Sequence, residues 1–228
     1  MTIIGLVPAR QGSKGLPNKN MKILNGKPLI YYSIVQSLKA SSIDRTIFST
    51  DSEEYQKYAL SLGAEAPCLR SKFASSDTAT DGHVYEEIIE TLNLNSNDII
   101  VHLRPTNPSR SIYLIDKVVK HLIETGADAI RTISKSRFSP YKMVAVENGC
   151  IADILPQPNK FLGTDQPRQI LPETFELNGN VDAFCVSNIQ KYGSAYPADT
   201  LGFIEDSKTA DIDTLDDFNN MENLLTAS

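Results

Sequence analysis

The stretch that decides the fold is Ile3-Ile4-Gly5-Leu6-Val7-Pro8-Ala9-Arg10-Gln11-Gly12-Ser13-Lys14-Gly15-Leu16-Pro17-Asn18-Lys19-Asn20. It starts as an apolar run of strand length and continues directly as a basic loop with two glycines. Glycine lets the backbone turn tightly enough for several N–H groups to point at one anion. Arginine offers paired donors to phosphate oxygens, and lysine adds a point charge. A loop that follows the first strand of a parallel sheet is well placed to bind phosphate groups.

The spacing within this loop matches neither of the two common phosphate-binding motifs. A P-loop ends in Gly-Lys-Ser/Thr, and the dinucleotide motif is Gly-x-Gly-x-x-Gly. The segment Gly12-Ser13-Lys14-Gly15 has neither pattern. Composition alone therefore leaves a second interpretation open, in which this is a solvated basic loop whose glycines only turn the chain.

Outward from this stretch, strand-like and helix-like segments alternate. Runs rich in isoleucine and valine predict strands at residues 3–8, 46–49, 98–103, 129–133 and 183–186. Apolar residues at helical spacing predict helices at 53–62, 84–92 and 114–125, and one more with Pro28 in its first turn. This alternation predicts one Rossmann-like α/β domain over residues 1–228, with a mostly parallel sheet and helices on both faces.

Regularity fails between about residues 134 and 178, where five prolines interrupt the pattern. Asn148-Gly149 favours a tight hairpin turn in this region. We therefore expect a small excursion from the main sheet. An isolated excursion would expose an apolar patch, so we expect a homodimer in which a partner covers Phe138, Tyr141 and Phe161.

Composition excludes several classes of protein. The net charge of −6 argues against nucleic acid or an anionic membrane as a partner. No apolar stretch approaches the roughly 20 residues of a membrane helix, and the first apolar run lacks the flanks of a signal peptide. Three widely spaced cysteines fit neither a disulfide framework nor a zinc ribbon. We expect a cytoplasmic protein.

Two acids near the C-terminus suggest a metal site. Asp211 and Asp213 alternate, so on an extended segment both carboxylates face the same side. Such hard oxygen ligands suit Mg²⁺, with Mn²⁺ as a substitute. The alternative is a helix N-terminus, in which Asp213 or Thr214 caps a helix that begins at Leu215.

Further segments occur in the order of one known family. They are Ser49-Thr50-Asp51, Leu69-Arg70, Ser76-Asp77-Thr78-Ala79, Leu103-Arg104-Pro105-Thr106-Asn107-Pro108-Ser109-Arg110, Gln166-Pro167-Arg168-Gln169, Asn178-Gly179 and Asp211-Ile212-Asp213-Thr214. With the loop after the first strand, they resemble the acylneuraminate cytidylyltransferases, or CMP-sialic acid synthetases, including the relatives that activate legionaminic and pseudaminic acids. The resemblance covers almost the whole chain.

This resemblance implies a nucleotide-diphospho-sugar transferase fold and a reaction. CMP from CTP would join an acidic 2-keto nonulosonic sugar, with release of pyrophosphate. The resemblance assigns catalysis to Arg10, Lys14, Lys19 and Asp213, and magnesium binding to Asp211 and Asp213. It assigns nucleotide binding also to Ala9, Gly12, Ser13, Asn20, Arg70, Ser76 and Asp77, and sugar binding to Arg104, Lys142, Arg168 and Asn178.

Several alternatives stay open. The residues around Ser76 could be a polar loop that caps a helix, and Arg168 could form a salt bridge with Glu173 instead of binding the sugar carboxylate. Arg104 stands where the family usually has glutamine, which leaves the identity of the sugar open. A Kdo-type cytidylyltransferase, a sugar-1-phosphate nucleotidyltransferase and a nucleotide-binding regulatory protein are the rival functions.

Overall fold

The computed structural model describes residues 1–12, 15–155, 167–205 and 211–226. The strands are β1 (Ile3–Pro8), β2 (Ile23–Leu24), β3 (Lys27–Pro28), β4 (Arg45–Ser49), β5 (Ile99–His102), β6 (Ala129–Lys135), β7 (Val144–Glu147), β8 (Cys150–Asp153), β9 (Phe175–Cys185) and β10 (Leu201–Ile204). The α-helices are α1 (Leu29–Lys39), α2 (Glu53–Ser61), α3 (Asp81–Leu92), α4 (Ile112–Thr125), α5 (Ser187–Tyr192) and α6 (Leu215–Thr226).

The central sheet has the strand order β10-β6-β9-β5-β1-β4. β1 runs parallel to β4 and β5, and β10 runs parallel to β6. Only β9 is antiparallel to its neighbours in this described sheet, because it returns between β5 and β6. The predicted mostly parallel sheet is therefore confirmed, and the carboxyl ends of β1 and β5 lie at the same edge.

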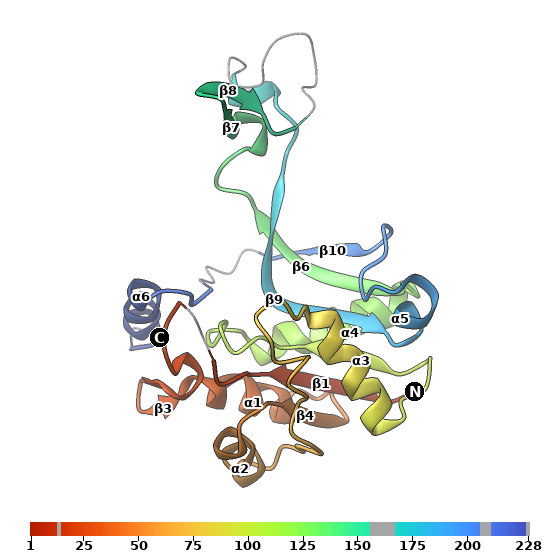
Figure 1. Cartoon of the computed structure of the whole chain (residues 1–228). Coiled ribbons are helices and arrows are strands. Elements are labelled where there is room, and N and C mark those ends of the chain that lie inside the picture. Colours follow the sequence, from red (N-terminus) through yellow and green to blue (C-terminus); the bar gives the residue numbers. More distant parts are fainter. Residues whose placement is uncertain (13–14, 156–166, 206–210, 227–228) are drawn as a thin grey trace.

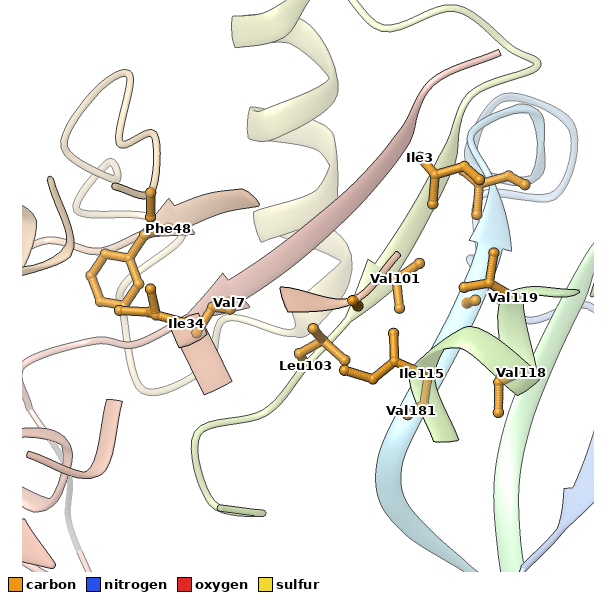
Figure 2. Packing of buried hydrophobic residues seen from close by; sticks show 14 of the residues in the cluster. Ile3, Val7, Ile34, Phe48, Val101, Leu103, Ile115, Val118, Val119 and Val181 are labelled. Carbon is orange, nitrogen blue, oxygen red and sulfur yellow. The ribbon is translucent and has the colours of Figure 1, made fainter. Parts of the chain in front are cut away.

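Helices cover both faces of the sheet because its strands alternate apolar residues between two cores (Figure 1). Val7 and Val101 pack with Ile34 of α1 and Ile115 of α4 on one face, and Figure 2 shows this cluster. Ile4, Leu6 and Ile100 face the other side, where α3 and α5 pack. Full burial of one such side chain stabilises the fold by about 1.5–3 kcal/mol.

A third core joins the C-terminal helix to the N-terminal loop. Phe218 and Met221 of α6 pack with Leu16, Leu24 and Ile212. Ile212 also donates its backbone N–H to the carbonyl oxygen of Thr106. These contacts hold the segment around Ile212 against the loop that follows β1, although the two segments lie almost 200 residues apart in sequence.

The predicted excursion projects from the sheet as an arm, defined here as the described residues between 136 and 174. Figure 1 shows the hairpin of β7 and β8 at its far end, beyond extensions of β6 and β9. Asn148 and Gly149 have φ values of 51° and 80°, as a primed two-residue turn requires. The ladder between β6 and β9 continues to Lys135 and Phe175. The excursion is therefore shorter than the predicted range of about 134–178.

The predicted elements are present, with corrections at their ends and some omissions, which include the two-residue strands β2 and β3. Pro28 directly precedes α1 instead of occupying its first turn. The predicted strand at 183–186 is only the end of the eleven-residue strand β9, and β10 and α5 were not predicted. The first part of β9 escaped prediction because its alternating residues are polar, namely Asn178, Asn180 and Asp182.

Two further findings concern the cysteines and the helices. The three cysteines are free thiols. Among the described helices, none combines the length and the apolar character needed to cross a lipid bilayer.

Candidate active site

A cavity of about 440 Å³ opens at the carboxyl ends of β1 and β5. Its lining combines the loop after β1, the segment before α3, the turn after β5 and the segment before α6. The lining residues are Pro8, Ala9, Arg10, Gly15, Lys19, Asn20, Arg70, Ala74, Ser76, Asp77, Ala79, Thr80, Asp81, Val84, His102, Arg104, Pro105, Thr106 and Asp213. The cavity thus lies at the predicted edge of the sheet, and most of the predicted nucleotide residues meet there.

Arg10 ties the loop after β1 to the segment before α3. Its Nη1 lies 3.1 Å from the carbonyl oxygen of Ser76 and 3.0 Å from Oδ1 of Asp77. The side-chain amide of Asn20 donates to the carbonyl oxygen of Arg10 at 2.8 Å, and Asn20 is buried. Asn20 therefore fixes the backbone of Arg10 and also lines the cavity, and its contact with the nucleotide stays a prediction.

Lys19 faces the cavity opposite the helix α6. Its Nζ donates to the carbonyl oxygen of Ile212 at 2.6 Å and lies 3.1 Å from Oδ1 of Asp213. The Asp213 side chain is 73% exposed, so this ion pair is open to exchange with a ligand. The loop also approaches closely at Gly15, where a Cβ atom would lie 2.6 Å from the Asp213 carbonyl oxygen.

Arg70 forms part of the cavity wall. It is buried, and its Nε and Nη2 donate to the hydroxyl and carbonyl oxygens of Ser49 at 3.0 and 2.5 Å. Burial lowers the pKa of Arg70, and the nearby Asp51 partly opposes that effect. The carboxylate of Asp51 accepts the backbone N–H of Gln11 at 2.8 Å. These bonds hold the end of β4 beside the loop after β1.

Thr214, and not Asp213, caps α6. The Thr214 hydroxyl accepts the N–H of Asp217 at 3.2 Å, and the Asp217 carboxylate accepts the N–H of Thr214 at 2.8 Å. This reciprocal pair is a capping box. The predicted helix N-terminus is therefore confirmed with Thr214 as its cap, whereas the Asp213 carboxylate turns toward Lys19 and does not cap the helix.

The acids near α6 fit a magnesium ion bound jointly with a nucleotide. Asp213 lines the cavity, and Asp211 lines a second cavity next to it. No group of three or more metal-binding side chains occurs within the described part of the chain. Mg²⁺ commonly takes one or two carboxylates and completes its shell with phosphate oxygens and water, so two aspartates suffice.

The second cavity, of about 320 Å³, lies at the ends of β6 and β9. It is lined by Arg104, Arg131, Ser134, Glu176, Leu177, Asn178, Gly179 and Asp211. Arg104 lines both cavities. The amide of Asn178 is engaged with its neighbours, because its oxygen accepts from Thr132 and its nitrogen donates to Glu205.

A network of charges holds Arg104 between the cavities. Its Nη1 lies 2.6 Å from Oδ2 of Asp182, and its Nη2 lies 3.1 Å from Oδ2 of Asp81. Arg131 donates to the same Asp182 oxygen at 3.1 Å. Although burial opposes the charge of Arg104, the two carboxylates raise its pKa.

His102 and two tyrosines support this network from the sheet. The hydroxyl of Tyr85 lies 2.5 Å from Nδ1 of His102 and 3.3 Å from the hydroxyl of Tyr196. Burial and the nearby arginines, Arg104 first among them, lower the pKa of His102 well below its usual value. The imidazole is therefore neutral at pH 7. His102 also lines the first cavity.

The structure separates the predicted site residues into three groups. Ala9, Arg10, Lys19, Asn20, Arg70, Ser76, Asp77, Arg104 and Asp213 line the first cavity, and Arg104, Asn178 and Asp211 line the second. Gly12, Lys142 and Arg168 line neither, and the last two belong to the arm. Ser13 and Lys14 lie outside the described residues. Glu173, the alternative partner of Arg168, instead pairs with Lys135 at 2.6 Å.

Sequence reasoning missed Asp81, His102 as a lining residue, and Arg131. Arg131 did carry a signal, because it is the one charged residue within the predicted strand at 129–133. Its partner Asp182 closely follows the predicted segment Asn178-Gly179 in sequence, but the pairing of Arg131 with Asp182 depends on the strand order.

Solved structures share this fold. A CMP:2-keto-3-deoxy-manno-octonic acid synthetase complexed with CTP superposes with a TM-score of 0.73 at 14% identity, covering 100% of this chain and 99% of that one. A 4-diphosphocytidyl-2C-methyl-D-erythritol synthase gives a TM-score of 0.70 at 12% identity, covering 98% of each chain. These likenesses show that the chain shares a Rossmann-like α/β fold with both structures.

Sequence comparisons define the family. The family model described as "Cytidylyltransferase" matches residues 4–148. Post-translational flagellin modification protein B of Campylobacter coli is 29% identical, covering 98% of this chain and 94% of that protein. CMP-N,N'-diacetyllegionaminic acid synthase of Legionella pneumophila is 28% identical, covering 99% and 97%. N-acylneuraminate cytidylyltransferase of Streptococcus agalactiae is 30% identical, covering 96% of this chain and 52% of that protein.

The chain belongs to the cytidylyltransferase family, and it is therefore a nucleotidyltransferase.

Proposed function

We propose that the chain joins CMP from CTP to an acidic 2-keto nonulosonic sugar of the sialic, legionaminic or pseudaminic type. The observation that carries this proposal is the pair of adjoining cavities. The first combines Arg10 and Lys19 with Asp213, as a nucleoside triphosphate and its metal ion require, and the second contains arginines that suit an acid. The named relatives point to the same class of sugar.

In this reaction the anomeric hydroxyl oxygen of the sugar attacks the α-phosphorus of CTP. The bond from the α-phosphorus to the bridging oxygen breaks, pyrophosphate leaves, and the hydroxyl proton passes to solvent. Lys19 moves from Asp213 to the triphosphate and offsets its charge, and Arg10 holds the loop in place. A magnesium ion bound through Asp211 and Asp213 would neutralise charge on the phosphates. Manganese could replace it.

We further propose that the active form is a homodimer. Val146 and Ile151 of the arm hairpin are 73% and 74% exposed, and Phe138 and Ile170 are also exposed. Several exposed apolar side chains on one projecting segment favour a partner that covers them. The arm carries Lys142 and Arg168, so a second copy could bring these cations to the site of its neighbour. A cytoplasmic location follows from the use of CTP.

The rival functions predict different substrates. A Kdo-type enzyme accepts an eight-carbon acid, a sugar-1-phosphate transferase needs a phosphate acceptor, and a regulatory protein binds nucleotide without turnover. The likeness to the octonic acid synthetase is a likeness of fold only, at 14% identity.

The test is pyrophosphate release with CTP and Mg²⁺, screened over N-acetylneuraminic, N,N'-diacetyllegionaminic and pseudaminic acids. Kdo, a hexose 1-phosphate, and ATP, GTP or UTP in place of CTP serve as controls. We expect turnover with CTP and at least one nonulosonic acid. Faster turnover with Kdo or with the sugar phosphate would replace the proposal by the corresponding rival, and CTP binding without any turnover would favour the regulatory protein.

A further inference from the structure

The starting observation is a row of polar side chains across one face of the sheet. Asp182 of β9 pairs in register with His102 of β5 on one side and with Arg131 of β6 on the other. The neighbouring residues Ile100, Ala129 and Phe184 on this face form an apolar core. A charged row next to such a core has a high desolvation cost, so it calls for an explanation beyond stability.

Arg131 is held by contacts that fix its orientation. Its Nη2 donates to Oδ2 of Asp182, and its guanidinium lies 4.4 Å from the centroid of the Tyr196 ring. Tyr196 is in turn fixed by Tyr85 through their hydroxyl groups. A guanidinium supported by an aromatic ring loses little entropy when it binds a ligand.

Arg104 and Arg131 keep N–H donors that their bonds to carboxylates do not use. Asp182 is completely buried, and both Arg104 and Arg131 share its Oδ2 atom. The carboxylate of Asp182 therefore pairs with two guanidinium groups that line the second cavity. Asp81, which lines the first cavity, pairs with Arg104. Each guanidinium has five N–H donors, far more than these bonds use.

The acidic residues that line the second cavity limit the charge of the anion that it can bind. Glu176 and Asp211 line it together with Arg104 and Arg131. Two acids disfavour a dianionic phosphate, whereas a monoanionic carboxylate carries half that charge. Glu176, which has no part in the proposed metal site, can accept hydrogen bonds from sugar hydroxyl or amide groups.

We propose that Arg131, supported by Asp182 and flanked by Arg104, binds the carboxylate of the acidic sugar from within the same subunit. This assignment rests on the function proposed above and deepens it. It differs from the assignment by resemblance, which gave the carboxylate to Arg168. Within one subunit, Arg168 lies on the arm and lines neither cavity, so it could reach this site only from a second copy of the chain.

The experiment compares the best acid of the substrate screen with its C1 methyl ester, which lacks the negative charge. Arg131→Gln should raise KM for the acid roughly 10- to 100-fold, as expected for the loss of a charged hydrogen bond. It should leave the affinity for CTP unchanged. The preference of the wild type for the acid over the ester should largely disappear, and Arg131→Lys should restore part of it.

The controls separate binding from folding. Arg45→Gln is the control for the loss of an arginine. Arg45 pairs with Glu65 at the start of β4, the end that lies away from the first cavity. This variant should change neither KM nor the preference for the acid over the ester. Because Arg131→Gln leaves Asp182 with one partner fewer, the double variant Arg131→Gln/Asp182→Asn removes both charges. It should melt closer to the wild type and still lack the preference for the acid.

Three outcomes overturn the inference. Arg131→Gln could retain the preference of the wild type, it could weaken acid and ester equally, or Arg168→Gln alone could abolish the preference. The function proposed above fails separately, when the wild type transfers CMP to no nonulosonic acid. Binding of the acid measured by calorimetry, with a non-hydrolysable CTP analogue present, distinguishes the two failures.

Discussion

Lys19 occupies a position in which it serves the protein before any nucleotide arrives. Its bonds to the Ile212 carbonyl and to Asp213 join the loop after β1 to the segment before α6. The same ammonium group faces the cavity that we assign to the triphosphate. Its removal should therefore affect turnover far more than stability.

We predict that Lys19→Ala lowers CTP turnover at least about 100-fold, in the range found when one charge-stabilising donor is lost. The free energy of unfolding should fall by about 1–2 kcal/mol, since the variant loses a hydrogen bond to the Ile212 carbonyl oxygen and a solvent-exposed ion pair with Asp213. Turnover and urea denaturation should be measured on the same preparation. Lys19→Met, which keeps the apolar stem, serves as the control for packing; wild-type turnover in either variant contradicts the role.

Asp213 can now be tested without the ambiguity of a helix cap. Thr214 performs the capping, so Asp213→Asn should leave the melting temperature nearly unchanged. Turnover should fall by orders of magnitude and recover partly at high Mg²⁺ or Mn²⁺, because an amide is a poorer ligand for a hard cation. Thr214→Ala is the matched control and should cost about 1 kcal/mol of stability. Full activity of Asp213→Asn at low Mg²⁺ would remove the metal site from the proposal.

The lowered pKa of His102 predicts that the stability of the protein depends on pH. The pKa of His102 is lowered in the folded protein, so below the unfolded value of about 6.5 the unfolded chain binds a proton that the folded chain does not. Stability is therefore full above pH 6.5 and falls as the pH decreases, by up to about 1.4 kcal/mol per pH unit. Urea unfolding at pH 7.5 and 5.5 measures this loss.

The variant His102→Gln identifies the group responsible. It lacks a titratable side chain, so its stability should change less between the same two pH values than that of the wild type. An equal change in both proteins would assign the pH dependence to other groups.

Among the elements, the loop after β1 and the segment before α6 depend on each other through one glycine. A methyl group at Gly15 would lie 2.6 Å from a backbone oxygen of Asp213, closer than real Cβ atoms come. Gly15→Ala should push the two segments apart and lower CTP affinity about tenfold or more, measured by calorimetry. At Gly12 an added Cβ meets nothing within 4 Å, so Gly12→Ala should keep the melting temperature of the wild type. Unchanged CTP affinity in Gly15→Ala would contradict this coupling.

The elements differ in how far the sequence alone predicts them. β1, its loop and the helix closed by Gly126 are encoded locally, by apolar periodicity and turn residues, and they were predicted. The pairing of Arg131 with Asp182 arises only because β9 enters between β5 and β6. Residues 51 positions apart carry no local sign of such a neighbour. The same applies to Thr214 as cap, because the choice between adjacent polar residues depends on side-chain orientation.

At the scale of the whole molecule, the apolar arm predicts association. The chain has a mass of 25.1 kDa, and sedimentation at micromolar concentration should give about twice that mass. Val146→Asp and Ile151→Asp place a charge on the most exposed part of the hairpin and should shift the protein toward monomer. Leu60→Asp, at an exposed site on α2, should leave the mass unchanged. A wild-type monomer under these conditions would refute the dimer.

The position of β9 also has a consequence for how the chain folds as it leaves the ribosome. β1, β4 and β5 can pair as soon as the first 102 residues are available. β6 must wait, because both of its partners in the sheet, β9 and β10, follow it in sequence. Synthesis of residues 136–174 intervenes before β9 can join the two parts. The N-terminal half can therefore form early, whereas β6 stays without its sheet partners until the arm has been made, and this interval is the stage at which a nascent chain is most exposed to misassembly.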